Sequence, residues 1–151
     1  MKRIFLLSFL ALSLSWQSPI WAEASAIGAK LNLKAYYFPN PNVCTVMVDF
    51  QKSASEILKT SGDKRVQLLA ANLLAEYGAN GQVGCKTPVK VRMLAVLVPG
   101  VDNYGRPDFG SRTNLIRLEG NVDKFRSLAS SRDGLSEATI RKYVELEVYK
   151  K

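Results

Sequence analysis

One segment of the sequence has the periodicity of a long amphipathic helix, and it lies between segments that alternate like strands. From Lys64 onward, apolar residues recur every three or four positions, which places them on one face of a helix. They are Val66, Leu69, Ala70, Leu73, Leu74 and Tyr77. A stripe of this kind has to be buried against another layer, so the chain is predicted to form a two-layer α+β sandwich.

Capping residues and glycines mark the ends of this helical region. Residues 53–56, Ser-Ala-Ser-Glu, have the spacing of a capping box and predict that a helix begins there. Gly62 then interrupts the pattern, and Asp63 is expected to cap a fresh start. Gly78 is expected to end the helix, which leaves 78–88 as a glycine-rich loop.

Five segments show strand patterns, and two shorter segments are helical or ambiguous. The predicted strands cover 29–38, 43–50, 89–98, 114–122 and 143–149. Residues 123–131 fit either a short helix or a continued edge strand, and 135–141 fit a helical turn capped by Asp133 or Ser136. The prediction is therefore a sheet of about five strands, mixed or antiparallel, with one long amphipathic helix on one face.

The two cysteines constrain how these elements connect. Cys44 opens the second predicted strand and Cys85 precedes the third, and their separation fits neither a CxxC motif nor a zinc knuckle. In an oxidising compartment the pair is most simply a structural disulfide, which contributes about 4 kcal/mol in the chain-entropy description. Because its Cα atoms must lie within about 7 Å, the helix has to return the chain to the start of the second strand. This permits a parallel third strand reached through a right-handed crossover.

The first 24 residues have the three parts of a secretory signal peptide. A positively charged start precedes the apolar run 4–14, and small residues around Ala24 match the cleavage pattern. Polar residues at 15–19 interrupt this run too early for a spanning helix of roughly 20 residues, and no later segment is long enough to cross a bilayer. The signal is typical of a bacterial Sec substrate. We therefore expect 25–151 to form a single globular domain that is periplasmic or secreted.

Composition narrows the classes of function. Cleavage after Ala24 leaves 127 residues with 19 basic and 12 acidic side chains, because Lys2, Arg3 and Glu23 leave with the signal. The resulting net charge of +7 favours anionic partners, although an exported domain can be basic without one, and no motif supports nucleic acid. The chain has no histidine, which excludes Ser-His-Asp and Cys-His catalysis and argues against a zinc hydrolase. No cofactor and no metal are expected.

The most unusual segment is the predicted loop 99–112, which is longer than a hairpin between two strands requires. It carries the candidate binding residues Asp102, Asn103, Tyr104, Arg106, Asp108, Phe109 and Arg112. Long ordered loops on a rigid sheet concentrate binding residues, and arginine with aromatic side chains is typical of interaction hot spots. The alternative is a solvated hairpin held by aspartate side chains. A calcium loop is not favoured, because the spacing lacks the alternating ligands and closing glutamate of an EF-hand.

Basic side chains on the predicted strand faces suggest a second binding feature. One patch could contain Lys30, Lys34, Lys90, Arg92, Arg106, Arg112 and Arg117, with Tyr36, Tyr104 and Phe109 between them. Such a patch would bind polyanions or stack on single strands. The simpler interpretation, which the sequence favours, is an ordinary solvated sheet face.

These observations predict a non-enzymatic exported binding or accessory module that acts through loop 99–112 and a basic surface. Its partner would be an envelope protein, such as a component of a secretion or surface assembly, or an anionic polymer. One alternative is a small periplasmic hydrolase that uses carboxylates or a Ser-Lys pair, although no two carboxylates are marked as converging. Another is a structural subunit that polymerises through an exposed strand edge.

Overall fold

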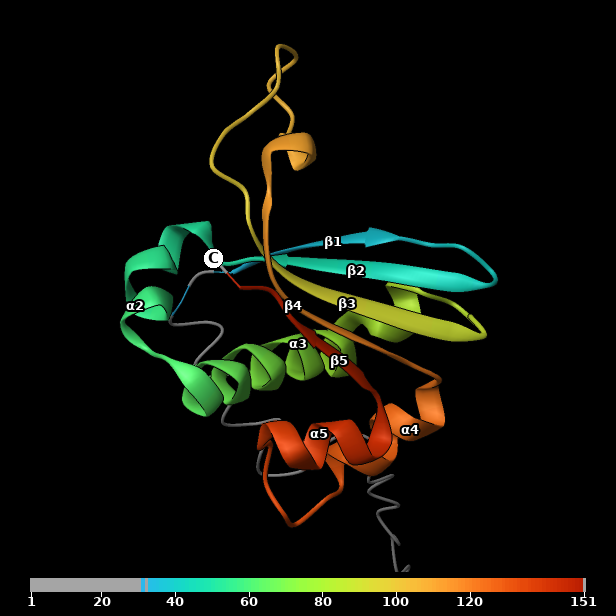
Figure 1. Ribbon diagram of the computed structural model, residues 1–151. Coiled ribbons are helices and arrows are strands. Elements are labelled where there is room, and N and C mark those ends of the chain that lie inside the picture. Colours follow the sequence, from blue (N-terminus) through green and yellow to red (C-terminus); the bar gives the residue numbers. More distant parts are fainter. Residues whose placement is uncertain (1–30, 32, 151) are drawn as a thin grey trace, which may run out of the picture.

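The computed structural model describes Leu31 and residues 33–150, which form a five-stranded sheet with helices packed on one face (Figure 1). The strands are β1 Lys34–Phe38, β2 Val43–Asp49, β3 Lys90–Leu97, β4 Thr113–Gly120 and β5 Glu145–Val148. The helical segments are η1 Gln51–Ser53, α2 Ala54–Lys59, α3 Gly62–Gly84, η2 Phe109–Ser111, α4 Val122–Ala129 and α5 Glu137–Tyr143. The predicted α+β sandwich with one long helix is confirmed. The expected signal peptide, its cleavage point and Lys30 lie outside the described residues.

The sheet is mixed and its strands lie in chain order, β1-β2-β3-β4-β5. β1 and β2 form an antiparallel hairpin, and β4 is antiparallel to both of its neighbours, β3 and β5. β2 and β3 are parallel, because η1, α2 and α3 carry the chain back to the end of the sheet at which β2 began. The parallel third strand that the cysteines permitted is therefore present.

The main core lies between the sheet and α3. All six residues of the predicted helical stripe are buried, and they pack against side chains such as Val46, Met93 and Ile116 from the central strands. Because strand side chains alternate between faces, the intervening β3 residues Leu94 and Val96 point to the opposite face and form a second, smaller cluster. β3 is thus apolar on both faces, as predicted for a central strand.

The disulfide joins the end of α3 to the beginning of β2. Cys44 and Cys85 are both buried, and their Cα atoms lie 5.7 Å apart. Cys44 is also the register partner of Val91 near the start of β3. The bond therefore fastens three elements at one end of the sheet, which confirms the predicted pairing and its geometric role.

The prediction that the long helix ends at Gly78 is wrong, since α3 continues to Gly84. A side chain at Gly84 would place its Cβ 2.2 Å from the Tyr37 ring, so the absence of a side chain lets the helix end lie directly against β1. The Tyr37 hydroxyl in turn donates a hydrogen bond of 3.0 Å to Glu76 Oε1 on α3. Contacts with the sheet thus outweigh the local preference of glycine for helix ends, and 78–84 is helix rather than loop.

The expected helix caps are also partly wrong, because two of the side chains make tertiary contacts instead. Ser53 does not cap α2; its hydroxyl donates to the Leu31 carbonyl at 2.8 Å. Asp63 does not cap α3 but accepts a 2.7 Å hydrogen bond from the Glu137 amide in the first turn of α5. The cap predicted at Ser136 is present, since its hydroxyl accepts from the Thr139 amide.

Several boundaries shift where tertiary packing decides them. The first strand begins at Lys34 rather than at residue 29, and Leu31 is buried outside it. The ambiguous segment 123–131 is helical, because Asn121 caps α4 by accepting from the Lys124 amide. The alternation of residues 143–149 predicts that Val148 points inward, but this residue is 38% exposed on the short edge strand β5. Within the described part of the chain, no helix is both long and apolar enough to span a bilayer.

The close contact at Gly84 provides a test of why α3 extends so far. Gly84→Ala should raise helix propensity by about 1 kcal/mol, yet we expect a net loss of about 1–3 kcal/mol in the free energy of unfolding, because the added methyl group overlaps the Tyr37 ring. Urea denaturation measures the difference. Gly100→Ala is the matched control, since a Cβ there meets nothing within 4 Å. A Gly84→Ala protein more stable than the parent would contradict this packing.

Candidate functional site

The chain between β3 and β4 leaves the sheet as a projecting arm, which we define as residues 99–112 (Figure 1). Its stem is closed by a β-bridge between Val101 and Pro107 and by a 3.1 Å hydrogen bond from the Asp108 amide to the Gly100 carbonyl. The tip, residues 102–106, is closed by a 2.7 Å hydrogen bond from the Asp102 amide to the Arg106 carbonyl. The predicted long loop is therefore an ordered hairpin extension.

Asp102 organises the tip from inside. Its Oδ1 accepts hydrogen bonds from the backbone amides of Tyr104 (2.8 Å) and Arg106 (2.9 Å), and its Oδ2 accepts from Arg106 Nε (2.9 Å). The Arg106 amide is the largest of the influences that hold the pKa of the Asp102 carboxyl below its usual range. Gly105 completes the turn with a positive φ of 77°, a conformation that glycine adopts readily. The carboxylate is thus used to shape the tip.

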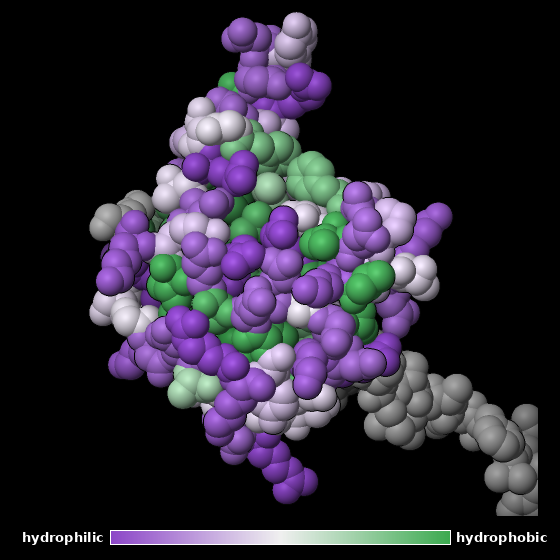
Figure 2. Space-filling model, turned by 45° about the vertical axis from the view of Figure 1, so that its right-hand side comes forward, coloured by the Kyte–Doolittle hydropathy of each residue, from purple (hydrophilic) through white to green (hydrophobic). Residues whose placement is uncertain are grey.

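Two side chains of the tip form its outer surface. Tyr104 is 83% exposed, and the Arg106 guanidinium lies over its ring at 5.1 Å from the ring centre. Asn103 is also exposed beside them. Figure 2 shows the arm standing out from the body, with an outer part that is mostly hydrophilic. The hydrogen bonds of Asp102 hold this tyrosine–arginine pair in place without a partner, so the tip is preorganised.

The other predicted site residues anchor the arm to the sheet. The Phe109 ring packs edge-on against Tyr36 and Phe38, with ring centres 5.1 and 5.5 Å apart. Arg112 donates from Nη1 to the Phe109 carbonyl at 2.9 Å, and Asp108 Oδ2 accepts from the Ser111 hydroxyl at 2.7 Å. The seven predicted residues therefore divide into a tip that faces solvent and a base that fixes the direction of the arm.

A hollow lies where the arm meets β1 and the end of β2. It has a volume of about 220 Å³, and apolar side chains such as Val101 and Pro107 line it together with Tyr36. Lys34 and Lys52 stand at its border. Burial, followed by the charge of Asp49, raises the pKa of Tyr36, so its phenol stays protonated at neutral pH. The hollow extends the candidate binding surface from the tip down to the sheet.

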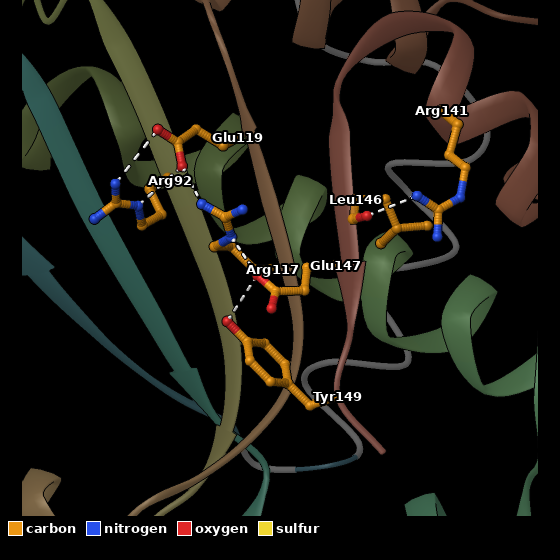
Figure 3. A network of polar contacts seen from close by, with 7 residues as sticks. All are labelled: Arg92, Arg117, Glu119, Arg141, Leu146, Glu147 and Tyr149. Atoms are coloured by element: carbon orange, nitrogen blue, oxygen red, sulfur yellow. Dashed lines mark hydrogen bonds and ion pairs between the residues drawn. The ribbon is translucent and has the colours of Figure 1, made fainter.

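The sheet face opposite α3, which we call the open face, carries an ion-pair network (Figure 3). Glu119 pairs with Arg92 at 3.0 Å and with Arg117 at 2.6 Å, and Arg117 continues to Glu147 at 3.1 Å. The Tyr149 hydroxyl donates to Glu147 at 3.2 Å. The hydrogen bond from Arg92, together with the charges of both arginines, lowers the pKa of Glu119. Glu119 is therefore ionised at neutral pH.

This network changes the meaning of the basic residues singled out in the sequence. Arg92 and Arg117 are neutralised by Glu119 and Glu147, and Arg106 lies away from them at the tip of the arm. The described members of the predicted patch thus do not combine into one free cationic surface. Glu119 and Glu147 were missed as partners. A sequence signal was present: Glu119 lies two residues after Arg117, and Glu147 two residues after Glu145. In strands that alternate, residues two apart share a face, so these carboxylates could be expected on outward faces.

Comparisons with known proteins do not add to this picture, since the chain matches no protein family, no curated protein and no solved structure among those compared. Among the described residues, no three aspartate, glutamate or cysteine side chains gather as a metal site would require. Within the part of the chain that the structure describes, the carboxyls of Asp102 and Glu119 have pKa values below their usual range, whereas a general acid needs a raised pKa. These two groups give the hydrolase alternative no support.

The anchoring role of Phe109 can be separated from the exposed role of Tyr104. Each edge-on aromatic contact contributes about 0.5–1.5 kcal/mol, so Phe109→Ala should lower the free energy of unfolding by about 1–3 kcal/mol. Tyr104→Ala should unfold like the parent protein, because its side chain is almost fully exposed. Thermal and urea unfolding of the two variants provide the comparison, and equal stabilities would show that Phe109 does not anchor the arm.

The order of the tip should depend on pH through Asp102. The pKa of the Asp102 carboxyl is lower in the folded tip than in the unfolded chain. The stabilisation of the tip by the ionised carboxylate is therefore complete above the ordinary aspartate range, and it is lost as the pH falls through the lowered folded value. An NMR titration should show the Tyr104 and Arg106 amides shifting together with the Asp102 carboxyl at this low midpoint. Asp102→Asn is the control, since it should abolish the shared transition. An ordinary aspartate midpoint would contradict the assigned hydrogen bonds.

Proposed function

We propose that this chain is an exported, non-enzymatic binding module of the bacterial envelope whose arm docks into a partner protein. The observation that carries the proposal is the preorganised tip, where Asp102 satisfies the backbone and leaves Tyr104 and Arg106 facing solvent. Arginine and tyrosine are enriched among the residues that dominate binding energy at protein interfaces. A tip that is already ordered loses little conformational entropy on binding.

The charge of the arm favours a protein partner over an anionic polymer. Arg106 is the cation at the tip, and it is already paired with Asp102 at 2.9 Å. Binding to a polyanion draws its affinity from several phosphate or sulfate contacts at once, and the tip does not supply several. A tyrosine ring backed by a guanidinium suits a pocket on a protein surface, with the apolar hollow at the base of the arm providing further contact area.

The proposal is tested by substituting the tip while leaving the base intact. Tagged protein is used to capture its partner from solubilised envelope, and the complex is then titrated with the purified partner. Tyr104→Ala and Arg106→Ala should each weaken binding at least about tenfold, or about 1.4 kcal/mol, without changing the unfolding curve. The matched control is Arg132→Ala, an exposed arginine in the segment between α4 and α5, on the far side of the sheet from the arm.

Three outcomes are distinguishable. One partner that is retained at high salt and lost with either tip variant supports the proposal. Polymer that is captured only at low salt, and equally by the tip variants, would place the binding activity elsewhere on the molecule. A partner whose affinity falls as much with Arg132→Ala as with Arg106→Ala would show that net charge, rather than the tip, determines binding.

A further inference from the structure

A second concave site lies at the end of the sheet opposite the arm. The arm leaves from the end of β3 and returns at the start of β4, whereas this cleft lies beside the start of β3 and the end of β4. Its volume is about 420 Å³. Residues of α4 and α5 form its other walls. Figure 1 shows these two helices below the sheet. The cleft is therefore separate from the candidate site on the arm.

Cationic side chains from three elements converge on the cleft. Lys90 comes from β3, Lys124 from α4, and Arg141 and Lys142 from α5. Two acidic residues, Glu119 and Glu145, also line it. The lining is thus predominantly basic, although the residues that make it so are spread over more than 50 positions of the sequence.

The acidic residues leave much of this charge uncompensated. Glu119 is paired with Arg92 and Arg117, which lie outside the cleft lining, and the charge of Lys90 also acts on it. Arg141 is paired with Glu137, which lies outside the lining as well. Among the described residues, no carboxylate lies within ion-pair distance of Lys124 or Lys142. Glu145 is the remaining negative charge in the lining. The cleft therefore holds more positive than negative charge that is free to act on a ligand.

One of the cations is also fixed in position. Arg141 donates from Nη1 to the Leu146 carbonyl at 2.8 Å (Figure 3). Its Nη2 donates to Glu137 at 2.9 Å. The guanidinium is thus anchored in the cleft wall, whereas the lysine side chains can adjust to a ligand. A fixed guanidinium beside mobile ammonium groups suits a multiply charged oxyanion, to which each group adds a charge-assisted hydrogen bond.

We propose that this cleft binds phosphate groups of a multivalent anion, through Lys90, Lys124 and Lys142 beside the anchored Arg141. The phosphates can belong to a soluble or polymeric polyphosphate or to the headgroups of an anionic lipid surface, since the recognition chemistry is the same. The site does not depend on the arm, and its failure would leave the proposed function of the arm unchanged.

The test uses tripolyphosphate as the soluble probe, and vesicles of phosphatidylglycerol with phosphatidylcholine as the lipid probe. Tripolyphosphate should shift the amide signals of residues lining the cleft, and affinity should fall as salt is raised. The double variant Lys124→Ala with Lys142→Ala should weaken binding at least about tenfold, or about 1.4 kcal/mol. The control is Lys59→Ala with Lys150→Ala, which removes the same charge from exposed positions outside the cleft.

The outcomes separate a site from a general effect of charge. Weaker binding of tripolyphosphate by the Lys124→Ala, Lys142→Ala protein, with unchanged binding by the control variant, supports the proposal. If vesicles show the same dependence on Lys124 and Lys142, lipid headgroups are one source of the phosphate; if only tripolyphosphate binds, the source is soluble or polymeric. Equal weakening by the two double variants, or no binding of either probe to the parent protein, would overturn the proposal.

Discussion

The parallel pairing of β2 with β3 is the constraint on which the rest of the structure depends. Two parallel neighbours cannot be joined by a turn, so the chain has to return along the sheet through η1, α2 and α3. The disulfide fastens this return where it ends, because Cys85 closes α3 and Cys44 lies beside the start of β3. Closing a loop of this length contributes about 4 kcal/mol in the chain-entropy description, a large share of the 5–15 kcal/mol typical of a domain. β3 then runs from the basic cleft at its start to the arm at its end, so the two lie at opposite ends of the sheet.

The sequence predicted those features that depend on local pattern. Periodicity identified the buried stripe of α3, and the two cysteines predicted the disulfide and permitted the crossover to a parallel third strand. The end of α3 was not predictable, because no local pattern shows that the helix continues past Gly78 to Gly84, where it lies against the Tyr37 ring. The hydrogen bond that Asp63 accepts from the Glu137 amide in the first turn of α5 was not predictable either, since the two residues lie far apart in the chain. Local signals are overridden where a distant residue supplies a better partner.

The distribution of charge was the least predictable property, because it depends on strand register. Arg92 lies opposite Glu119, and Arg117 opposite Glu147, and both pairs follow from how β4 is aligned with its neighbours. That alignment shifts at a bulge between Ala95 and Val96, which no sequence pattern marks. Cations expected to form a basic strand face are therefore neutralised. Basic side chains with no acidic partner in the part of the chain that the structure describes, such as Lys124 and Lys142, lie together at the cleft although they come from separate elements. The net charge of the chain therefore says little about where an anion would bind.

The sequence located the candidate site in residues 99–112, but it did not predict the role of each side chain there. Its composition drew attention to the loop, but composition does not tell a residue that faces solvent from one that anchors. Phe109 and Tyr104 are both aromatic, yet one packs on β1 and the other is almost fully exposed. Asp102 and Asp108 both shape the backbone of the arm rather than presenting free carboxylates.

The arm begins and ends at neighbouring positions of the sheet, and this affects which substitutions the protein can tolerate. Leu97 and Thr113 are register partners, so the sheet is already paired where the arm departs and where it returns. None of the tip residues 102–106 is buried, so substitutions at the tip are not filtered by folding stability. In the proposed function, recognition and folding are therefore encoded in separate parts of the chain. One body of this kind can carry arms of different length and chemistry, and a change of partner need not be accompanied by any change in the sheet that supports the arm.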